Sequence, residues 1–573
     1  MTREVEIEVR DVGEAIVAAL AHGGVDHLFF TSGTELAFYQ EAIAKARALG
    51  RPALRLITMT HEYVALNAAL GYAAVAGKPA VTSAHVDVGT QHHGGALHTA
   101  WRSGLPVLMT AGAPATSAPG MRGGRDSPHF WTQQTFDQNG IVRQFTKWDH
   151  RLEAQDNPGL IVSRALQVAQ TEPCGPVYLS LPREVVYAPL GKTRFATAAR
   201  LGIPRPAAPD AGAIEEIAER LARAREPVIV AGCGRNPAEV PALTELAELM
   251  GVPVVQCAWH AYQSFPMNHP LYAGKRSVAD ADVVIAIEAD VPWLPGPNGP
   301  SPDAFVAVIG VDPVKHRIPT YEFTADLRLT SDALSAIRAL TAALRRRVAP
   351  GDAAIAARAR RAAEAATARI AKVEQEARAL ADQPMIDPRF VSYQVAQLLD
   401  DNSLVIDDTT QDRLFPYLRV ARPGSYFHNP GSTGGWAPGA ALGAKLAAPE
   451  RDVIAVTGDG FYLYATPTAA LWAAVRHGAP FLTVVYQNRS YTTGTVAVAN
   501  AYPDGYAAKA DFDGGYLEPA MDFAKEAESA GAHGETVRDP REVGPALRRA
   551  LAHTRAGRPA VVAMWLPRLL RGD

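Results

Sequence analysis

The sequence lacks long hydrophobic runs. Its unbroken apolar stretches are short, as in Val228–Ala231 and Val283–Ile287, whereas a membrane-spanning helix needs roughly 18 or more such residues. The first residues, MTREVEIEVRDV, also lack the basic start and apolar core of a secretory signal. We therefore expect no membrane partner, no export and a cytoplasmic location.

Cysteine is scarce, and basic charge is not clustered. The three cysteines, Cys174, Cys233 and Cys257, are odd in number and show no paired spacing, so reduced buried thiols are expected rather than a disulfide framework. The formal net charge is −3, and no stripe of lysine and arginine stands out that would neutralise a phosphate backbone. We therefore expect no nucleic-acid partner.

The sequence does contain enough apolar residues for several cores. The chain has 573 residues, 48% of them hydrophobic and 20% charged, which is a globular composition too long for one core. Strand-like runs alternate with helix-compatible segments, as in helix-covered parallel sheets. The expected fold class is therefore α/β, with three open parallel-sheet domains.

We place these domains at residues 1–190, 191–345 and 386–573. A Pro- and Ala-rich linker is expected at 189–211, and Ala/Arg/Glu-rich composition predicts a linker helix within 346–385. The expected strands lie in 27–32, 54–60, 79–84, 105–111 and 175–182, then in 227–234, 253–259, 282–289 and 304–312, and finally in 403–408, 452–460, 481–488 and 559–567.

Polar residues follow two neighbouring expected strands of the third domain. VIAVTGDG ends in Gly458-Asp459-Gly460, and FLTVVYQN ends in Asn488. Because parallel strands end at one sheet edge, Asp459 and Asn488 should lie together. Carboxylate and amide oxygens suit Mg²⁺ bound to a diphosphate, which glycine allows the backbone to approach. A structural turn with a strand-end cap is the alternative for GDG alone.

These residues resemble the thiamine-diphosphate motif of acetolactate synthase, benzoylformate decarboxylase and their relatives. The resemblance implies cofactor contacts at Gly458, Asp459, Gly460, Phe461 and Asn488. It implies metal ligands at Asp459, Asn488 and the backbone carbonyl of Ser490. The family's usual Asn pair is Gln487-Asn488 in this sequence, a departure in its first member.

The segment THEYVALNAALGYAAVAGKPAV, residues 60–81, is similar to a second motif of the same family and implies a catalytic role for Glu62. Thiamine must lose its C2 proton to become a nucleophile, and a carboxylate bonded to the pyrimidine ring promotes that loss. A solvated carboxylate that opens a helix is the alternative. The two motifs occur in the family's order, which favours the catalytic interpretation.

The segment HVDVGTQHHGGALHTAW resembles benzoylformate decarboxylase without a gap. It implies that His85 is an active-site histidine, and Thr34 aligns with a serine that contacts substrate. An imidazole can shuttle protons near neutral pH, although a histidine that fixes the local turn is the alternative. His92 and His93 match nothing in the family and stay unassigned.

Further alignments in this family are less regular. Asp408 and Gln411 match residues near the diphosphate end in acetolactate synthase, and Gln134 matches a substrate-side glutamine. Gly434 falls where the family places a large side chain under the thiazolium, so Trp436 or a shifted register would have to supply that wedge. The middle domain lacks the Gly-Met-His-Gly run that accompanies flavin, and no basic cluster indicates a coenzyme A site.

The resemblance covers nearly the whole chain and implies pyrimidine-binding, central and diphosphate-binding domains, in that order. It implies thiamine diphosphate and Mg²⁺, acting on a small carbonyl substrate through ylide and enamine intermediates. We expect a 2-keto acid decarboxylase that is a homodimer or homotetramer, with active sites at the subunit interface. The alternatives are an acetolactate-synthase-like carboligase or 2-hydroxyacyl lyase, and a non-catalytic paralogue that binds cofactor.

Overall fold

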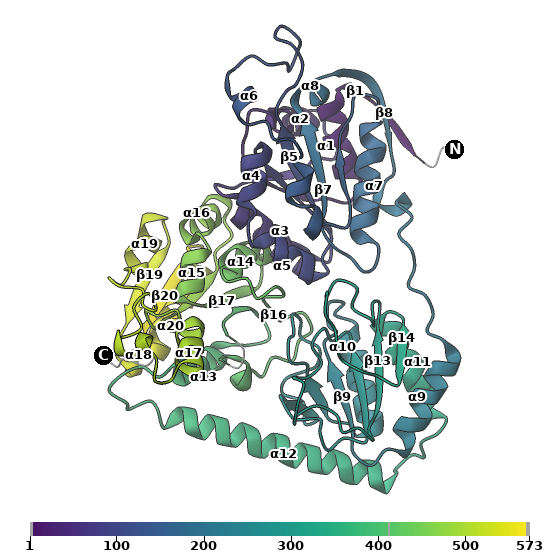
Figure 1. Ribbon diagram of the computed structural model, residues 1–573, viewed down its shortest axis with the longest axis vertical. Coiled ribbons are helices and arrows are strands. Elements are labelled where there is room, and N and C mark those ends of the chain that lie inside the picture. Colours follow the sequence, from purple (N-terminus) through teal and green to yellow (C-terminus); the bar gives the residue numbers. More distant parts are fainter. Residues whose placement is uncertain (1–3, 411–412, 569–573) are drawn as a thin grey trace.

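The computed structural model describes residues 4–410 and 413–568 and contains three six-stranded parallel sheets, each with helices packed around it (Figure 1). The expected fold class is thus confirmed. The middle strands are buried along their length, which explains their uninterrupted apolar sequences.

The N-terminal sheet has the strand order β3-β2-β4-β5-β7-β6. Its strands are β2 (His27–Phe30), β3 (Arg55–Thr58), β4 (Ala80–Ala84), β5 (Val107–Ala113), β6 (Asp149–Arg151) and β7 (Val177–Pro182). The helices of this domain are α1 (Val12–His22), α2 (Ala37–Ala48), α3 (Glu62–Ala76), α4 (Val86–His92), α5 (Ala96–Ser103), α6 (His129–Thr132), α7 (Pro158–Gln170) and α8 (Arg183–Val186).

A separate two-stranded antiparallel sheet joins β1 (Val5–Asp11) to β8 (Pro189–Phe195). The first part of the expected linker at 189–211 is therefore a strand, and that part of the prediction is wrong. Pairing with the start of the chain supplies backbone hydrogen bonds that the local Pro/Gly-containing sequence does not indicate.

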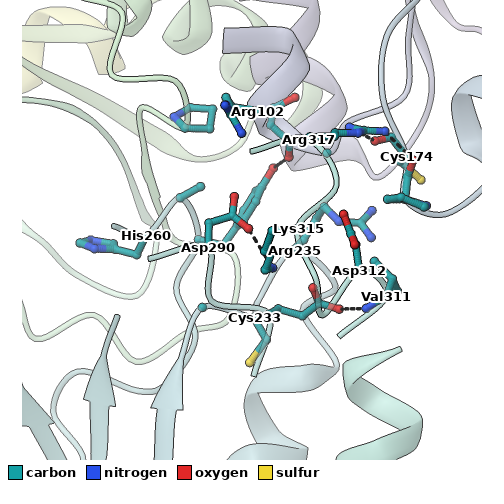
Figure 2. A pocket seen from close by; sticks show the side chains of 18 of the residues that line it. Arg102, Cys174, Cys233, Arg235, His260, Asp290, Val311, Asp312, Lys315 and Arg317 are labelled. Atoms are coloured by element: carbon teal, nitrogen blue, oxygen red, sulfur yellow. Dashed lines mark hydrogen bonds and ion pairs between the residues drawn. The ribbon is translucent and has the colours of Figure 1, made fainter. Parts of the chain in front are cut away.

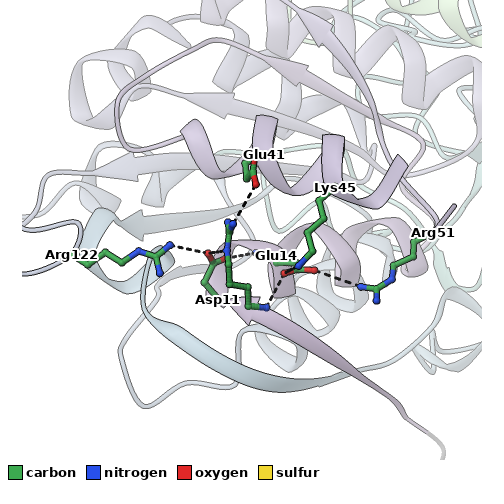
Figure 3. Close-up of polar contacts among 7 residues, drawn as sticks. Asp11, Glu14, Glu41, Lys45, Arg51 and Arg122 are labelled. Carbon is green, nitrogen blue, oxygen red and sulfur yellow. Dashed lines mark hydrogen bonds and ion pairs between the residues drawn. The ribbon is translucent and has the colours of Figure 1, made fainter. Parts of the chain in front are cut away.

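Charged residues fix this sheet to the helices beside it (Figure 3). Asp11 caps α1 by accepting from the backbone N–H of Glu14 at 3.0 Å, and its carboxylate also lies 3.3 Å from Arg122. Glu14 pairs with Lys45 of α2 at 2.7 Å and lies 3.6 Å from Arg51. Because both carboxylates are buried, their pairing prevents isolated buried charge.

The middle sheet has the order β11-β10-β9-β12-β13-β14. Its elements are α9 (Ala211–Arg223), β9 (Pro227–Ala231), α10 (Glu239–Met250), β10 (Val254–Gln256), β11 (Tyr272–Gly274), β12 (Val283–Ile287), β13 (Phe305–Gly310), β14 (Leu327–Thr330) and α11 (Ala333–Arg345). The expected linker helix is α12 (Ala353–Arg378), which runs from the middle to the C-terminal domain (Figure 1). Asp352 caps its first turn.

The C-terminal sheet has the order β16-β15-β17-β18-β20-β19. Its strands are β15 (Ser403–Asp408), β16 (Tyr426–His428), β17 (Asp452–Gly458), β18 (Leu482–Gln487), β19 (His533–Val537) and β20 (Ala560–Trp565). The helices are α13 (Pro388–Leu398), α14 (Trp436–Ala447), α15 (Asp459–Tyr464), α16 (Pro467–His477), α17 (Thr492–Ala501), α18 (Tyr506–Lys509), α19 (Phe523–Ser529) and α20 (Val543–Arg555).

The N- and C-terminal domains meet where α3 packs directly on α14 (Figure 1). Small residues allow this approach: a Cβ on Gly71 would overlap the Ala440 carbonyl, and one on Gly443 would overlap the Ala68 carbonyl. The two backbones are thus in contact, and the first turn of α3, which begins at Glu62, is held against the C-terminal domain. In the described residues, no helix combines the length and apolar character needed to cross a membrane.

Candidate active site

Most of the expected diphosphate-binding residues share one cavity. It has a volume of about 300 Å³ and lies at the carboxyl edge of the C-terminal sheet, where β17 and β18 run parallel with Gly458 opposite Tyr486. Its lining includes Asp408, Gly458, Asp459, Gly460, Phe461, Asn488 and Ser490. Sequence spacing predicted that Asp459 and Asn488 lie together, and the parallel sheet places both in this lining.

Asp459 is a buried carboxylate in the wall of this cavity, with 3% of its surface exposed. Its two oxygens accept from the backbone N–H groups of Gly460 at 2.8 Å and Arg489 at 2.5 Å. Burial raises the pKa of Asp459 to about 6, although these hydrogen bonds favour the charged form. A cation at this position would stabilise the carboxylate.

Asn488 stands beside Asp459 after the end of β18. Its amide nitrogen donates to Thr492 at 2.8 Å, and its amide oxygen accepts from the N–H of Ser490 at 2.9 Å. Arg489, between Asn488 and Ser490, has the left-handed φ of 56°. This bend turns the Arg489 N–H toward Asp459 while the guanidinium packs over Trp565 at 4.2 Å. The chain is therefore bent tightly at the proposed ligands.

The donor set fits a hard divalent cation that is also bound by diphosphate oxygens. Among the described residues, no group of three His, Cys, Asp or Glu side chains could hold a metal alone. Asp459, Asn488 and the Ser490 carbonyl would supply only part of an octahedral shell, which is how Mg²⁺ is commonly bound with phosphates. A Cβ on Gly458 would meet nothing within 4 Å, so this strand end is open toward a ligand.

Asp408, in the wall of the same cavity, holds a turn of the backbone through hydrogen bonds. Its carboxylate accepts from Asn429 at 2.8 Å and from the backbone N–H groups of Gly435 at 3.0 Å and Ala437 at 3.2 Å. Burial raises the pKa of Asp408 to about 7. It therefore anchors the turn that opens α14. The other predicted residue of this segment, Gln411, lies outside the described residues.

Phe461 occupies the space that a side chain at position 434 would need. A Cβ on Gly434 would overlap the Phe461 ring, and Phe461 lines the cavity. Trp436 is buried in the core and is not among the cavity-lining residues. Of the two aromatic residues, Phe461 is therefore the one placed to support a ligand above Gly434, a role that the alignment of Gly434 alone did not indicate.

Glu62 begins α3 and is 8% exposed. Its carboxylate lies 3.4 Å from Nδ1 of His92, whose ring stacks on His61. His93 is fully buried, and burial lowers its pKa to about 4 against the opposing charge of Glu62. Next to Glu62, the Tyr63 hydroxyl donates to the Gly434 carbonyl at 2.8 Å. The described residues that line the C-terminal cavity include none from the N-terminal domain.

His85 and Thr34 belong to a polar group in the N-terminal domain. His85 Nδ1 lies 2.9 Å from Glu35, and the Thr34 hydroxyl donates to the other Glu35 oxygen at 2.8 Å. Gln133 contacts His85 Nε2 at 3.3 Å, and His129 lies 3.5 Å from Thr34. The sequence prediction brought together His85 and Thr34 but missed the other three.

A signal for Glu35 was present in the sequence: it is a carboxylate next to Thr34, just before apolar residues. Gln134, the expected substrate-side residue, lies just after α6 and pairs with Arg125, which lies in the loop before that helix. Arg125 also lies over the Trp131 ring at 4.9 Å. Because the short helix α6 and the loops around it carry few periodic signals, the positions of His129 and Gln133 needed the tertiary structure.

A second cavity, of about 160 Å³, lies between the N-terminal and middle domains (Figure 2). Lys315 lies 2.9 Å from Asp290, Arg235 pairs with Glu172, and Glu288 accepts from the Val311 N–H at 2.9 Å. Burial raises the pKa of Glu288 to about 7. Paired side chains of the protein thus line this cavity, which lies at the edge where open α/β sheets bind ligands.

The chain is similar to several known proteins in sequence and in fold. The chain is 28% identical to benzoylformate decarboxylase from Pseudomonas aeruginosa, over 89% of this chain and 91% of that protein. It is 26% identical to sulfoacetaldehyde acetyltransferase from Castellaniella defragrans, over 96% and 92%. The crystal structure of benzoylformate decarboxylase from Polynucleobacter necessarius superposes with a TM-score of 0.78 at 18% identity, over 97% and 99%, and shows the same fold.

Family models match all three domains. Residues 10–141 match the N-terminal TPP binding domain of thiamine pyrophosphate enzymes, residues 214–340 the central domain and residues 409–564 the C-terminal TPP binding domain. The three matches follow the family's order and cover most of the chain, so this protein belongs to the thiamine pyrophosphate enzyme family.

Proposed function

We propose that the protein is a thiamine-diphosphate- and Mg²⁺-dependent decarboxylase of 2-keto acids. The observation that carries the cofactor part is the cavity at the edge of β17 and β18, where Asp459 and Asn488 adjoin an open Gly458. The similarity to benzoylformate decarboxylase and the placement of His85 beside Thr34 support decarboxylation.

Asp459, Asn488 and the Ser490 carbonyl would hold Mg²⁺, and Gly458, Gly460 and Phe461 would border the bound cofactor. When bound, the cofactor supplies a carbon nucleophile and takes up the electrons released as a carbon–carbon bond breaks. Glu62 would hold a proton on the pyrimidine. His85 Nε2 would exchange a proton with the reacting substrate, and Thr34 would orient its carbonyl group.

The cofactor proposal is tested by titrating metal-free protein with thiamine diphosphate in a calorimeter, with and without Mg²⁺. Asp459→Asn should weaken the Mg²⁺-dependent binding by at least about tenfold, because it removes the buried carboxylate. Asp452→Asn is the matched control: it lies at the other end of β17 and pairs with Arg555 at 2.6 Å. Binding that is indifferent to Mg²⁺ or to Asp459 would refute the proposal.

Transfer of the cleaved group to an acceptor carbonyl is the second candidate, favoured by the similarity to sulfoacetaldehyde acetyltransferase. Product analysis with pyruvate and benzoylformate separates the two. Release of the free aldehyde supports decarboxylation, whereas acetolactate or another ligated product supports transfer. Cofactor binding without any turnover of carbonyl donors would instead support a non-catalytic paralogue.

The proposed active site combines two subunits of a homodimer or homotetramer. Within one chain, the described lining of the diphosphate cavity comes from the C-terminal domain, while Glu62, His85 and Thr34 lie in the N-terminal domain. A second chain would bring the N-terminal domain with these three residues to the C-terminal cavity of the first.

A further inference from the structure

Glu35 is the most completely buried carboxylate next to the candidate reaction centre, with 0% of its surface exposed. It follows β2 and faces His85, which precedes α4. Two glycines make room for this arrangement: a Cβ on Gly112 would overlap the Glu35 side chain, and one on Gly33 would crowd the His85 ring. The backbone is therefore built around the contact between the carboxylate and the imidazole.

We propose that Glu35 is the positioning residue of His85: it holds the ring with a proton on Nδ1, so that Nε2 alone takes up and returns the proton exchanged with substrate. This inference rests on the proposed function for the identity of the reaction, and on the 2.9 Å contact for the role of Glu35. A carboxylate on one ring nitrogen fixes the tautomer and orientation of the other.

The contacts around Glu35 fit this role. One carboxylate oxygen lies against His85 Nδ1, and the other accepts from the Thr34 hydroxyl at 2.8 Å. Glu35 thereby orients both of the expected substrate-side groups. On the far side of the ring, the Gln133 amide lies 3.3 Å from Nε2. An amide N–H donated to that nitrogen requires the proton to sit on Nδ1, facing Glu35.

The charges around His85 all favour its protonated form. Glu35 on the loop after β2, Glu62 on α3 and Asp87 on α4 are the charged groups that face it. The hydrogen bond to Glu35 is the largest influence and raises the pKa of His85 above its ordinary value, against the opposing effect of burial. For Glu35, burial raises the pKa, but the hydrogen bonds from His85 and Thr34 outweigh it and leave the pKa lowered.

The test is an NMR titration of the protein labelled with ¹³C at histidine Cε1, with the His85 signal assigned by its loss in His85→Gln. We expect Glu35→Gln to lower the His85 pKa by about 1 pH unit or more, because a neutral amide cannot stabilise the imidazolium. Glu35→Asp should retain part of the effect. Glu184→Gln is the matched control, since Glu184 accepts from Thr116 in the same domain.

An unchanged His85 pKa in Glu35→Gln, or an equal fall in Glu184→Gln, would overturn the proposal. If Glu35→Gln does not fold, the wild-type titration decides: a His85 pKa at or below the ordinary value of roughly 6.5 would overturn it. These measurements need no substrate. They therefore separate a failure of this inference from a failure of the proposed function, which would show as absence of turnover in wild type.

With a substrate that is turned over, kinetics give an independent measurement. The protonated imidazole is lost as pH rises through its pKa, so the alkaline limb of kcat/KM should move to lower pH in Glu35→Gln by the same amount as the NMR pKa. A merely structural role would reduce the amplitude of the profile and leave the limb in place, and that result would contradict the proposal.

Discussion

At the residue scale, Gly434 and Phe461 form a complementary pair at the cavity wall. The family that this chain resembles has a large side chain at the place of Gly434, and we expected Trp436 or a shifted register to replace it. The structure instead places the ring of Phe461, from the first turn of α15, over the glycine. The large side chain beside the cavity therefore comes from α15 and not from the turn that contains Gly434. An alignment compares positions one at a time, so it could identify the missing side chain but not its replacement.

This pairing predicts a double-mutant cycle. Gly434→Leu should displace the Phe461 ring, lower the free energy of unfolding by about 1–3 kcal/mol and weaken binding of thiamine diphosphate, because added atoms have no space. Adding Phe461→Ala to that variant should recover most of both losses. Urea unfolding and calorimetric titration of the four proteins measure the coupling; additive effects of the two substitutions would show that the side chains do not compete for one space.

At the element scale, the strands that sequence missed within the three six-stranded sheets have a common position. The central strands were predicted because burial on both faces makes them continuous apolar runs. The missed strands β6, β11, β14, β16 and β19 each lie at the edge of a six-stranded sheet. Edge strands have one neighbour and are less uniformly apolar, as in Asp149–Arg151 and His533–Val537. Their existence depends on pairing with distant residues, which local composition does not encode.

The candidate site, too, could be predicted only where its residues follow predictable strands. Asp459 and Asn488 follow strands whose order in the sheet can be reasoned from a parallel fold, so their proximity was predictable. Glu35 and Gln133 reach His85 from loops, and no spacing rule relates those three positions. The contact between α3 and α14 is likewise visible in sequence only as scattered small residues.

That helix contact carries its own prediction. Gly443→Ala places a methyl group against the Ala68 carbonyl on the facing helix, so we expect the free energy of unfolding to fall by about 2 kcal/mol or more despite the better helix propensity of alanine. Gly494→Ala in α17 is the control, because a Cβ there meets nothing within 4 Å. Chemical denaturation measures both. Equal stability of the two variants would show that α3 and α14 can separate without loss.

At the scale of the whole molecule, the proposed active site draws on both the N- and C-terminal domains, so its activity would depend on how the chains assemble. Glu62 and Asp459 belong to different domains, and only Asp459 borders the diphosphate cavity. If each active site takes Glu62 from one chain and Asp459 from another, two inactive variants can complement each other. A symmetric dimer contains two such sites, related by its two-fold axis.

We therefore predict that Glu62→Gln and Asp459→Asn proteins, each inactive alone, regain activity when they are mixed in equal amounts, unfolded and refolded together. The mixture should reach roughly a quarter of wild-type activity, because half of the dimers contain one chain of each kind and each of these has one intact site of two. Light scattering establishes that dimers or tetramers form. The control mixes wild type with a protein that carries both substitutions. If the sites are shared between chains, every site of a mixed dimer lacks one residue, and activity should also fall to roughly a quarter of wild type. If each site is confined to a single chain, about half of the activity should remain. No recovery in the first mixture would show that one chain supplies both residues.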